Sequence, residues 1–439
     1  MASLVKHAND DSRDALTGLA DIEFARRQIA EWQESWPDTE HGCPLHAMLI
    51  VPGRIETLNV AFGETAGDGA LVEVAHRIRH FAADELESSV WLAARISGGS
   101  FLLVAREECS RERWQWLAEA LADAVAMPIS NPGGEGSIRL SPRLVLLRAS
   151  KNDTPASMLD TLAEGARKLR DNPSRRIAWS SGELARAGRT HHELEADLLT
   201  AIDRDEIEVV FQPQYSVATG SLVGAEALAR WHHPVLGRIG AGTLFTIAER
   251  ADHVTQLTRH IAHRALLSAA RWPDGLQLSL NVTPADLSAS SFYRDFLAMV
   301  ADSDFDAHRI TLEITEQVLL SDLEQVSEML GELREQGISL ALDDFGAGFC
   351  NFHYLKVLPL DRIKLDQSMV QDVMDDERDL AVFRAIIAMA KALDLKVTAE
   401  GIEAHEQLEL IAAEGCDVWQ GFLRSHPMPC DEFLTLAMG

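Results

Sequence analysis

Seven apolar runs in the second half of the sequence each end on a polar residue able to bind a metal or a phosphate. They are residues 222–226, 276–281, 309–313, 338–344, 361–364, 396–400 and 417–420. Most are separated by segments with helical periodicity, such as 322–336 and 377–393. Continuous apolar runs that alternate with helices are typical of buried parallel strands. The pattern predicts a TIM-like (βα)8 barrel, whose strand ends converge on one face.

The polar residues of these runs form a set of hard oxygen ligands. They are Glu226, Asn281, Glu313, Asp343, Asp344 and Glu400. Oxygen ligation with one amide suits Mg2+ or Mn2+ rather than zinc. A shared carboxylate can bridge two divalent ions about 3.5–4 Å apart, a spacing that suits in-line phosphoryl displacement. Taken alone, Asp343-Asp344 could be a solvated turn, but the full set predicts a metal site.

Two further residues, and Glu400 from the ligand set itself, are candidates for the chemistry. Lys364 lies in an apolar run, where it could hold the attacking water, stabilise developing charge, or only neutralise the acids. Glu400 could be a ligand, a base for the water, or both. Arg230 could reach a substrate phosphate, because the guanidinium fork matches phosphate oxygens; a surface salt bridge is the alternative.

Composition limits the class of protein. The 439 residues are enough for about two domains. The net charge of −28 and the lack of a basic run argue against a binder of duplex nucleic acid. Five cysteines without CxxC spacing indicate reduced thiols. No apolar run reaches the roughly 20 residues of a membrane span, so we expect a cytoplasmic protein without membrane insertion.

The first half of the chain has a mixed α/β pattern. We predict an α/β sandwich over residues 14–180, with helices at 21–36, 70–85 and 110–126 and strands at 46–51, 91–96, 101–105 and 138–147. A hairpin-like turn falls at 97–100, and residues 171–190 are predicted to connect the domains. The second domain then spans 191–439 and begins with a helix at 191–202.

Eight motifs, in order, make residues 191–439 resemble the EAL domain, the bacterial phosphodiesterase of cyclic di-GMP. They are Phe211-Gln212-Pro213, Glu226-Ala227-Leu228-Ala229-Arg230-Trp231, Asn281-Val282-Thr283-Pro284, Glu313-Ile314-Thr315-Glu316, Asp343-Asp344-Phe345-Gly346-Ala347-Gly348, Ile363-Lys364-Leu365-Asp366, Ala399-Glu400-Gly401-Ile402-Glu403 and Gln420-Gly421-Phe422. The resemblance implies a metal-dependent enzyme, using two Mg2+ or Mn2+ ions, that hydrolyses cyclic di-GMP to linear pGpG, and a homodimer formed through this domain.

The resemblance also implies a role for each matching residue. The metal ligands would be Glu226, Asn281, Glu313, Asp343, Asp344 and Glu400. Lys364 and Glu400 would handle the water, and Gln212, Leu228, Arg230 and Gln420 would bind the substrate. Glu316 would steady the loop after Asp344, and Glu403 would support the ligands. The sequence departs from the family in that loop, where it has Ala347 and Phe349-Cys350-Asn351; this leaves the ligands whole and bears on the stiffness of the loop.

The segment Asp14-Ala15-Leu16-Thr17-Gly18-Leu19 resembles the start of a GGDEF domain, the diguanylate cyclase fold. Where that family has its signature, this chain has Ser97-Gly98-Gly99-Ser100-Phe101, without either acid. The metal-binding aspartates of the family fall on Val51 and Gly53. Phosphoryl transfer needs carboxylates that hold Mg2+ on the triphosphate, so we predict a degenerate domain without cyclase activity.

Two residues of the first domain leave a nucleotide role open. Asn59 and Asp68 match the guanine-binding positions of the GGDEF family, so the domain could sense GTP. Alternatively they are turn and helix-cap residues, with Asp68 preceding the helix at 70–85, in a domain that is structural or dimerising. For the whole protein, the alternative to the enzyme is a receptor that binds cyclic di-GMP without cleaving it and signals through a partner protein.

Overall fold

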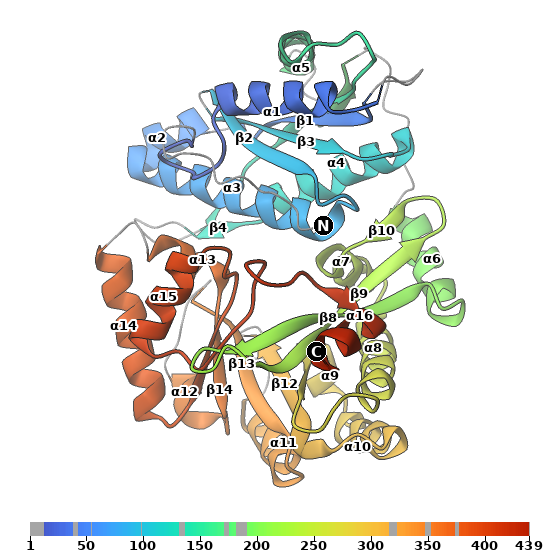
Figure 1. Ribbon diagram of the computed structural model, residues 1–439, viewed down its shortest axis with the longest axis vertical. Coiled ribbons are helices and arrows are strands. Elements are labelled where there is room, and N and C mark those ends of the chain that lie inside the picture. Colours follow the sequence, from blue (N-terminus) through green and yellow to red (C-terminus); the bar gives the residue numbers. More distant parts are fainter. Residues whose placement is uncertain are drawn as a thin grey trace. The chain divides into compact units, whose positions relative to one another are not determined.

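The computed structural model describes residues 13–37, 43–53, 55–97, 99–130, 137–170, 175–180, 191–315, 323–346, 353–373 and 377–438. The chain divides into two compact units. The first consists of Met1–Leu194 together with His232–Thr243, and the second of Glu195–Trp231 and Leu244–Gly439. Figure 1 shows the elements of both units.

A five-stranded sheet forms the centre of the first unit. Its order is β2 (Trp91–Ser97), β3 (Ser100–Arg106), β1 (Leu45–Val51), β6 (Arg143–Arg148) and β7 (Ile177–Trp179). The pair β6–β7 is parallel and the other neighbours are antiparallel. The short strands β4 (Ile129–Ser130) and β5 (Ser137–Ile138) pair separately. This α/β sandwich confirms the predicted fold class.

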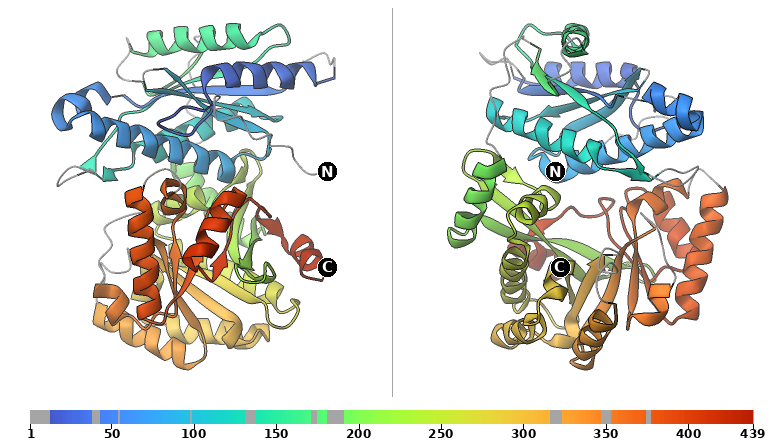
Figure 2. Two further views of the ribbon diagram at one scale, coloured as in Figure 1. Left: turned by 60° about the vertical axis from the view of Figure 1, so that its left-hand side comes forward. Right: turned by 180° about the vertical axis from the view of Figure 1, so that it is seen from behind.

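Helices cover both faces of that sheet, as the views in Figure 2 show. On one face lie α1 (Ile22–Glu34) and α5 (Pro155–Arg170), which contact each other and the strands. On the other lie α3 (Glu64–Glu85) and α4 (Arg111–Ala126), and α2 (Ile55–Phe62) packs on α3. The side chain of Asp21 accepts a hydrogen bond from Phe24 N at the start of α1, and Ser110 accepts one from Arg113 N at the start of α4. Such capping groups satisfy backbone donors that the first turn leaves open.

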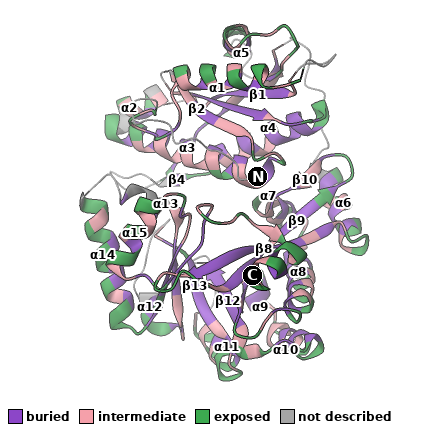
Figure 3. Ribbon diagram, in the orientation of Figure 1, coloured by how far each residue is buried: buried purple, intermediate pink, exposed green. Residues whose placement is uncertain are grey.

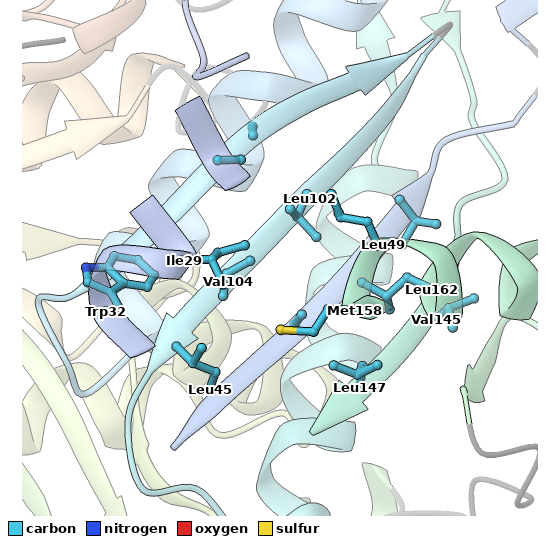
Figure 4. Close-up of a cluster of buried hydrophobic side chains, with 14 of the residues drawn as sticks. Ile29, Trp32, Leu45, Leu49, Leu102, Val104, Val145, Leu147, Met158 and Leu162 are labelled. Carbon is cyan, nitrogen blue, oxygen red and sulfur yellow. The ribbon is translucent and has the colours of Figure 1, made fainter. Parts of the chain in front are cut away.

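The apolar core beneath α1 and α5 follows from strand alternation. Leu45, Ala47 and Leu49 of β1 point into it and meet Ile29 of α1 and Met158 of α5 (Figure 4). The residues between them face the other side of the sheet, because side chains alternate along a strand.

Most sequence predictions for this unit are confirmed, with two corrections. Residues 171–190 are not simply a connection, because 177–179 form strand β7 at the edge of the sheet. The helix predicted from residue 70 begins at Glu64, so Asp68 lies inside α3 and is not a cap. Helices α2 and α5 were not predicted.

Eight strands close into a barrel in the second half of the chain. Their order is β9 (Leu222–His233), β11 (Gln277–Val282), β12 (Ile310–Thr315), β13 (Ser339–Phe345), β14 (Arg362–Leu365), β15 (Lys396–Ala399), β16 (Val418–Trp419) and β8 (Ile207–Ser216), and β8 pairs back onto β9. The edge strands β10 (Gly237–Ile239) and β17 (Met428–Pro429) extend the sheet. The predicted TIM-like barrel is confirmed, with one difference: β8 is antiparallel to both of its neighbours, β9 and β16.

The remaining helices follow the strands of the barrel. They are α6 (His191–Asp203), α7 (Ala241–Arg250), α8 (Val254–Ala269), α9 (Pro284–Ser288), α10 (Phe292–Ser303), α11 (Leu323–Glu335), α12 (His353–Val357), α13 (Gln367–Asp372), α14 (Glu377–Ala392), α15 (His405–Glu414) and α16 (Cys430–Met438), with a 3-10 turn at Ala307–Arg309. Figure 3 shows buried strands and helices with exposed outer faces. Among the described helices, none combines the length and apolar character needed to cross a membrane.

Candidate metal centre

The barrel brings the predicted ligands to neighbouring positions on adjacent strands. Asn281 on β11 is paired with Glu313 on β12, and Asp343 on β13 is paired with Thr315. Glu400 and Gln420 directly follow β15 and β16. The prediction that each ligand ends a strand is wrong for Glu226, because β9 continues past this residue to His233. Its register is set instead by antiparallel pairing with β8, which places Gln212 opposite it.

The Lys364 ammonium lies at the centre of the acidic side chains. Its Nζ atom is 2.6 Å from Glu313 Oε2, 2.8 Å from Glu400 Oε1, 3.0 Å from Asp343 Oδ1 and 3.3 Å from Glu226 Oε2. The Lys364 side chain is 1% exposed. A buried ammonium needs such partners, because desolvation of a lone charge costs several kcal/mol. Lys364 therefore holds four carboxylates together around a single positive charge.

Two amide side chains fix the orientation of the acids around Lys364. Asn281 Nδ2 donates to Glu226 Oε1 at 2.8 Å. Gln420 Nε2 donates to Glu226 Oε2 at 2.8 Å and to Glu400 Oε1 at 2.9 Å. Glu226 thus accepts hydrogen bonds from two amides as well as from the ammonium of Lys364. Both of its oxygens are held in fixed positions.

The Asp343-Asp344 pair reaches the site through an irregularity in β13. The register against β14 shifts between Leu342 and Phe345, and Asp344 has a positive φ of 55°. Asp344 N donates to Asp343 Oδ1 at 3.0 Å. Neighbouring side chains on a regular strand face opposite ways. The irregular backbone lets both carboxylates approach the same place.

Two groups of carboxylates among the described residues have the spacing of a metal site. One is Glu226, Glu313 and Asp343; the other is Asp343, Asp344 and Glu400. In each group one oxygen from every residue lies within 4.8 Å of the others. Asp343 belongs to both groups, which is the arrangement expected of a carboxylate shared by two ions.

Burial and charge shift the pKa values of these groups in opposite directions. Burial raises the pKa of the Glu313 carboxyl to about 8, and the negative charge of Glu226 adds to the rise. Burial also raises the pKa of Glu400 well above its usual range. For Glu226, burial is outweighed by the Lys364 ammonium and the donated hydrogen bonds, so its pKa is lowered. For Lys364, the acids outweigh burial and hold its pKa well above the ordinary value. The site has more carboxylates than one ammonium can neutralise.

The predicted substrate-binding residues flank this cluster. Leu228 and Arg230 follow Glu226 at alternate positions of β9, so the three share one face of the strand. Arg230 is buried, and its Nη1 atom donates to Ala229 O at 2.8 Å. Gln212 does not join the carboxylates; its Nε2 atom donates to Ser425 O at 2.8 Å.

Other predicted positions lie apart from the cluster or outside the described residues. Glu403 is exposed after β15. Glu316, Ala347 and Cys350 lie outside the described residues, so the predictions for the loop after Asp344 stay predictions.

The sequence analysis missed Gln214. Its Nε2 atom donates to Gln420 Oε1 at 3.0 Å, and its side chain is buried. The available signal was its position, two residues after Gln212 and therefore on the same face of β8. The position of Gln214 on β8 does not by itself identify its partner Gln420, which follows the neighbouring strand β16.

The first unit lacks carboxylates at the positions where the GGDEF resemblance would place them. Val51 ends β1, and Gly53 follows with a φ of +70°. A Cβ on Gly53 would lie 2.9 Å from Ser141 O, so the backbone leaves no room for a side chain. Ser97 pairs with Ser100 in the β2–β3 hairpin, and Gly99 there has a φ of +134°.

The two predicted guanine-binding residues lie on separate helices. Asn59 is on α2 and Asp68 is exposed on α3. A Cβ at Gly67 would lie 1.8 Å from Asn59 Oδ1, so the Asn59 amide packs directly against the backbone of α3. That oxygen is buried and has no hydrogen-bond partner within the described part of the chain.

Comparison with known families divides the chain in the same order. Residues 195–427 match the family described as the EAL domain, and residues 11–175 match the family described as diguanylate cyclase, GGDEF domain. The chain therefore has a tandem GGDEF–EAL architecture.

Several relatives have named activities. The chain is 29% identical over 439 residues to the cyclic di-GMP phosphodiesterase NbdA of Pseudomonas aeruginosa, covering 96% of this chain and 54% of that protein. It is 35% identical over 264 residues to the cyclic di-GMP phosphodiesterase PA2567 of the same species, covering 59% of this chain and 45% of the relative. The solved structure of the phosphodiesterase PaMucR in complex with c-di-GMP superposes with a TM-score of 0.53 at 29% identity, over 55% of this chain and 100% of the solved one. The chain spans 50% to 66% of the length of other curated relatives.

Proposed function

Because this chain belongs to the EAL domain family, we propose that it is a metal-dependent phosphodiesterase that hydrolyses cyclic di-GMP to linear pGpG. The observation that carries the proposal is the buried carboxylate cluster around Lys364, at the barrel face where the family resemblance places the active site. We assign residues 14–180 to a degenerate GGDEF domain and 191–439 to the phosphodiesterase domain, in a cytoplasmic protein that forms a homodimer through the latter.

The described residues fit a site for two divalent cations. The donor set is all oxygen, which suits Mg2+ or Mn2+. The residues that would hold the ions are Glu226, Asn281, Glu313, Asp343, Asp344 and Glu400. In each of the two groups that share Asp343, one oxygen from every residue lies within 4.8 Å of the others. The ions would supply Lewis-acid activation of a water and neutralise charge on the phosphate.

The side chains around the cluster have distinct roles in this proposal. The water attacks phosphorus and the bond to a ribose 3′ oxygen breaks, because linear pGpG keeps a 5′ phosphate. The 3′ oxygen leaves as part of the linear product and takes up a proton from solvent to become a hydroxyl. Glu400, which directly follows β15, would accept a proton from the water. Lys364, 2.8 Å from Glu400, donates to the developing negative charge. Arg230 would bind a substrate phosphate, with Gln212, Leu228 and Gln420 completing the substrate pocket.

The first domain is regulatory in this proposal. Gly53 and Gly99 stand where a cyclase would need acids, and both have positive φ values that side chains rarely adopt. Without carboxylates to hold Mg2+ on a triphosphate, the domain would not make cyclic di-GMP. Asn59 and Asp68 remain as candidates for binding the guanine of GTP.

The test of the enzyme is product formation by the full chain. Purified protein is incubated with cyclic di-GMP and Mg2+ or Mn2+, with and without EDTA, and the nucleotides are separated by chromatography. The proposal requires conversion to pGpG that stops with EDTA. Binding of cyclic di-GMP that is recovered intact in the presence of metal would contradict it and favour the receptor.

The same assay with added GTP tests the first domain. A change of rate with GTP that is lost in the double variant Asn59→Ala/Asp68→Ala would support GTP sensing. A GTP response that survives in this variant would place the sensor elsewhere, and no response in the parent would favour a structural role.

A further inference from the structure

We infer that Gln214 is a positioning residue that fixes which end of the Gln420 amide faces the metal ligands. This inference deepens the proposed function and rests on it, because the ligands concerned are Glu226 and Glu400. Within the described residues, Gln214 makes no hydrogen bond to either acid, and it acts on them through Gln420.

The strand pairing places the two glutamines opposite each other. On the antiparallel pair β8–β16, Ser216 is opposite Val418 and Tyr215 is opposite Trp419. The next residues along are Gln214 and Gln420, which the register brings side by side. Gln214 is 3% exposed and Gln420 is 8% exposed. Their hydrogen bond is therefore shielded from water, where the loss of a partner costs most.

The direction of the Gln420 amide follows from the atoms around it. Its Nε2 atom has two hydrogens, and it donates to Glu226 Oε2 at 2.8 Å and Glu400 Oε1 at 2.9 Å. Its Oε1 atom accepts from Gln214 Nε2 at 3.0 Å. An amide has two donor hydrogens and one acceptor oxygen. All three are used in this orientation.

The reversed orientation would put an acceptor against acceptors. If the Gln420 amide flipped, its Oε1 atom would face the oxygens of Glu226 and Glu400, and its Nε2 atom would face Gln214 Nε2. Ionised carboxylates only accept hydrogen bonds. The two acids therefore require the Gln420 nitrogen to face them. The donor of Gln214 stabilises the same orientation, because it satisfies the Gln420 oxygen on the opposite side.

Neighbouring contacts hold β8 and the segment after β16 in this register. Gln212 Nε2 donates to Ser425 O at 2.8 Å, and the Tyr215 hydroxyl and Ser425 Oγ are 2.7 Å apart. The Arg424 guanidinium lies 4.3 Å from the centre of the Tyr215 ring. These three contacts join the same two segments on either side of Gln214, so they hold the Gln214–Gln420 pair in place.

The consequence is a fixed spacing between two ligands of different strands. Glu226 comes from β9 and Glu400 follows β15, and Gln420 bridges them. Outer partners of metal ligands typically change metal affinity by about 10–100-fold when removed. Gln214 is one step further out, so we expect the lower end of that range.

The test is a double-mutant cycle read by Mn2+ affinity, measured by calorimetry on the full chain without substrate. Gln214→Met, which keeps the length but removes the donor, is expected to weaken Mn2+ binding by about 10-fold. In Gln420→Met, adding Gln214→Met should have no further effect, because the residue through which Gln214 acts is gone. Effects that multiply in the double variant would overturn the inference.

Two further variants separate positioning from general loss of packing. Thr311→Val on β12 removes a buried hydroxyl that has no hydrogen-bond partner in the described ranges, and Mn2+ affinity should not change. Gln214→Glu replaces the donor by an acceptor facing Gln420 Oε1, so it should weaken binding at least as much as Gln214→Met. If Gln214→Met does not fold, Gln214→Glu tests the inference in its place.

The outcomes distinguish this inference from the proposed function. If the parent chain binds Mn2+ and both Gln214 variants bind it equally well, the positioning role is wrong and the proposed function stands. If the parent chain does not bind Mn2+ at all, both are wrong.

Discussion

The two units use strained backbone in opposite ways. In the barrel, Asp344 keeps its side chain at a φ of +55°. In the first unit, two of the four positions where the GGDEF resemblance places acids are Gly53 and Gly99, at φ values of +70° and +134°. A side chain held in such a conformation costs about 1–3 kcal/mol and persists where the surroundings or a function require it. At these positions the barrel has an acid at a positive φ, whereas the first unit has glycine.

Buried ionisable groups show the same contrast. Lys364 is charged in the barrel because four carboxylates surround it. His46, on β1 of the first unit, is fully buried, and the charged side chain that shifts its pKa is the positive Arg148. Burial first, and then Arg148, lower the pKa of His46 to about 4. The charge of Lys364 is stabilised by the surrounding carboxylates, whereas burial and Arg148 disfavour the protonated form of His46. The barrel therefore stabilises a buried charge, whereas the first unit buries a neutral imidazole.

Removal of a ligand should have the largest effect. Glu226→Ala removes a member of the first carboxylate group together with the acceptor of Asn281 and Gln420. We expect cleavage of cyclic di-GMP to fall by more than about 100-fold, beyond the loss usual for an outer partner. The rate is measured by chromatography of the products, and folding by circular dichroism. Glu409→Ala on the exposed side of α15 is the control; a Glu226→Ala enzyme that retains a tenth of the parent rate would contradict the two-metal scheme.

Removal of the central ammonium should destabilise the barrel when metal is absent. Lys364→Met leaves buried carboxylates without their counter-charge, which typically costs about 3–5 kcal/mol. Urea unfolding in EDTA should show this loss, and Mn2+ should restore part of it because the ions replace the missing charge. Lys396→Met, an exposed position on the adjacent strand β15, should change stability by less than about 0.5 kcal/mol. Equal losses with and without Mn2+ would argue against a metal site at this cluster.

The strands of the barrel could be predicted from the sequence more completely than the contacts within its site. Apolar runs and their polar ends identified the strands and most ligands, because each signal lies within a few neighbouring residues. Glu226 was misplaced at a strand end because the length of β9 depends on its pairing with β8, which a local pattern does not contain. Gln214 was missed for the same reason, since its partner is 206 residues away in the sequence. Lys364 was found as a candidate, whereas its four contacts required the closed barrel.

The first unit shows how fold and function can be predicted unequally. Strand alternation located β1, β2 and β3, whereas α2 and α5 were missed because their place depends on packing against α3 and the sheet. The absence of acids at 97–101 was visible in the sequence. The positive φ values of Gly53 and Gly99, which would strain an aspartate at either position, could be seen only in the structure.

A change of pH should affect the first unit through His46. Its folded pKa of about 4 is below the ordinary value of 6.5, so protonation favours the unfolded chain. The contribution to stability is full above pH 6.5 and falls as the pH drops towards 4, by up to about 3 kcal/mol. Urea unfolding of the full chain at several pH values should show a smaller slope over this range in His46→Leu. The exposed His80→Leu on α3 should keep the parent slope, and an unchanged slope in His46→Leu would show that His46 is protonated in the folded state.

Restoration of the signature acids in the first unit should have the smallest effect on activity. Gly99→Asp with Ser100→Glu rebuilds the signature acids, but Gly99 has a φ of +134° and Val51 and Gly53 still lack the carboxylates for Mg2+. We expect no synthesis of cyclic di-GMP from GTP and a loss of about 1–3 kcal/mol in stability from the strained aspartate. The substitutions are made in the Glu226→Ala background, so that any cyclic di-GMP formed would accumulate and be detected by chromatography. Ser100→Glu alone, without the strained position, is the control. Product above the level of that control would mean that the sheet can hold metal without acids at residues 51 and 53. The two units would then differ in the side chains at residues 99 and 100, and not in what their backbones allow.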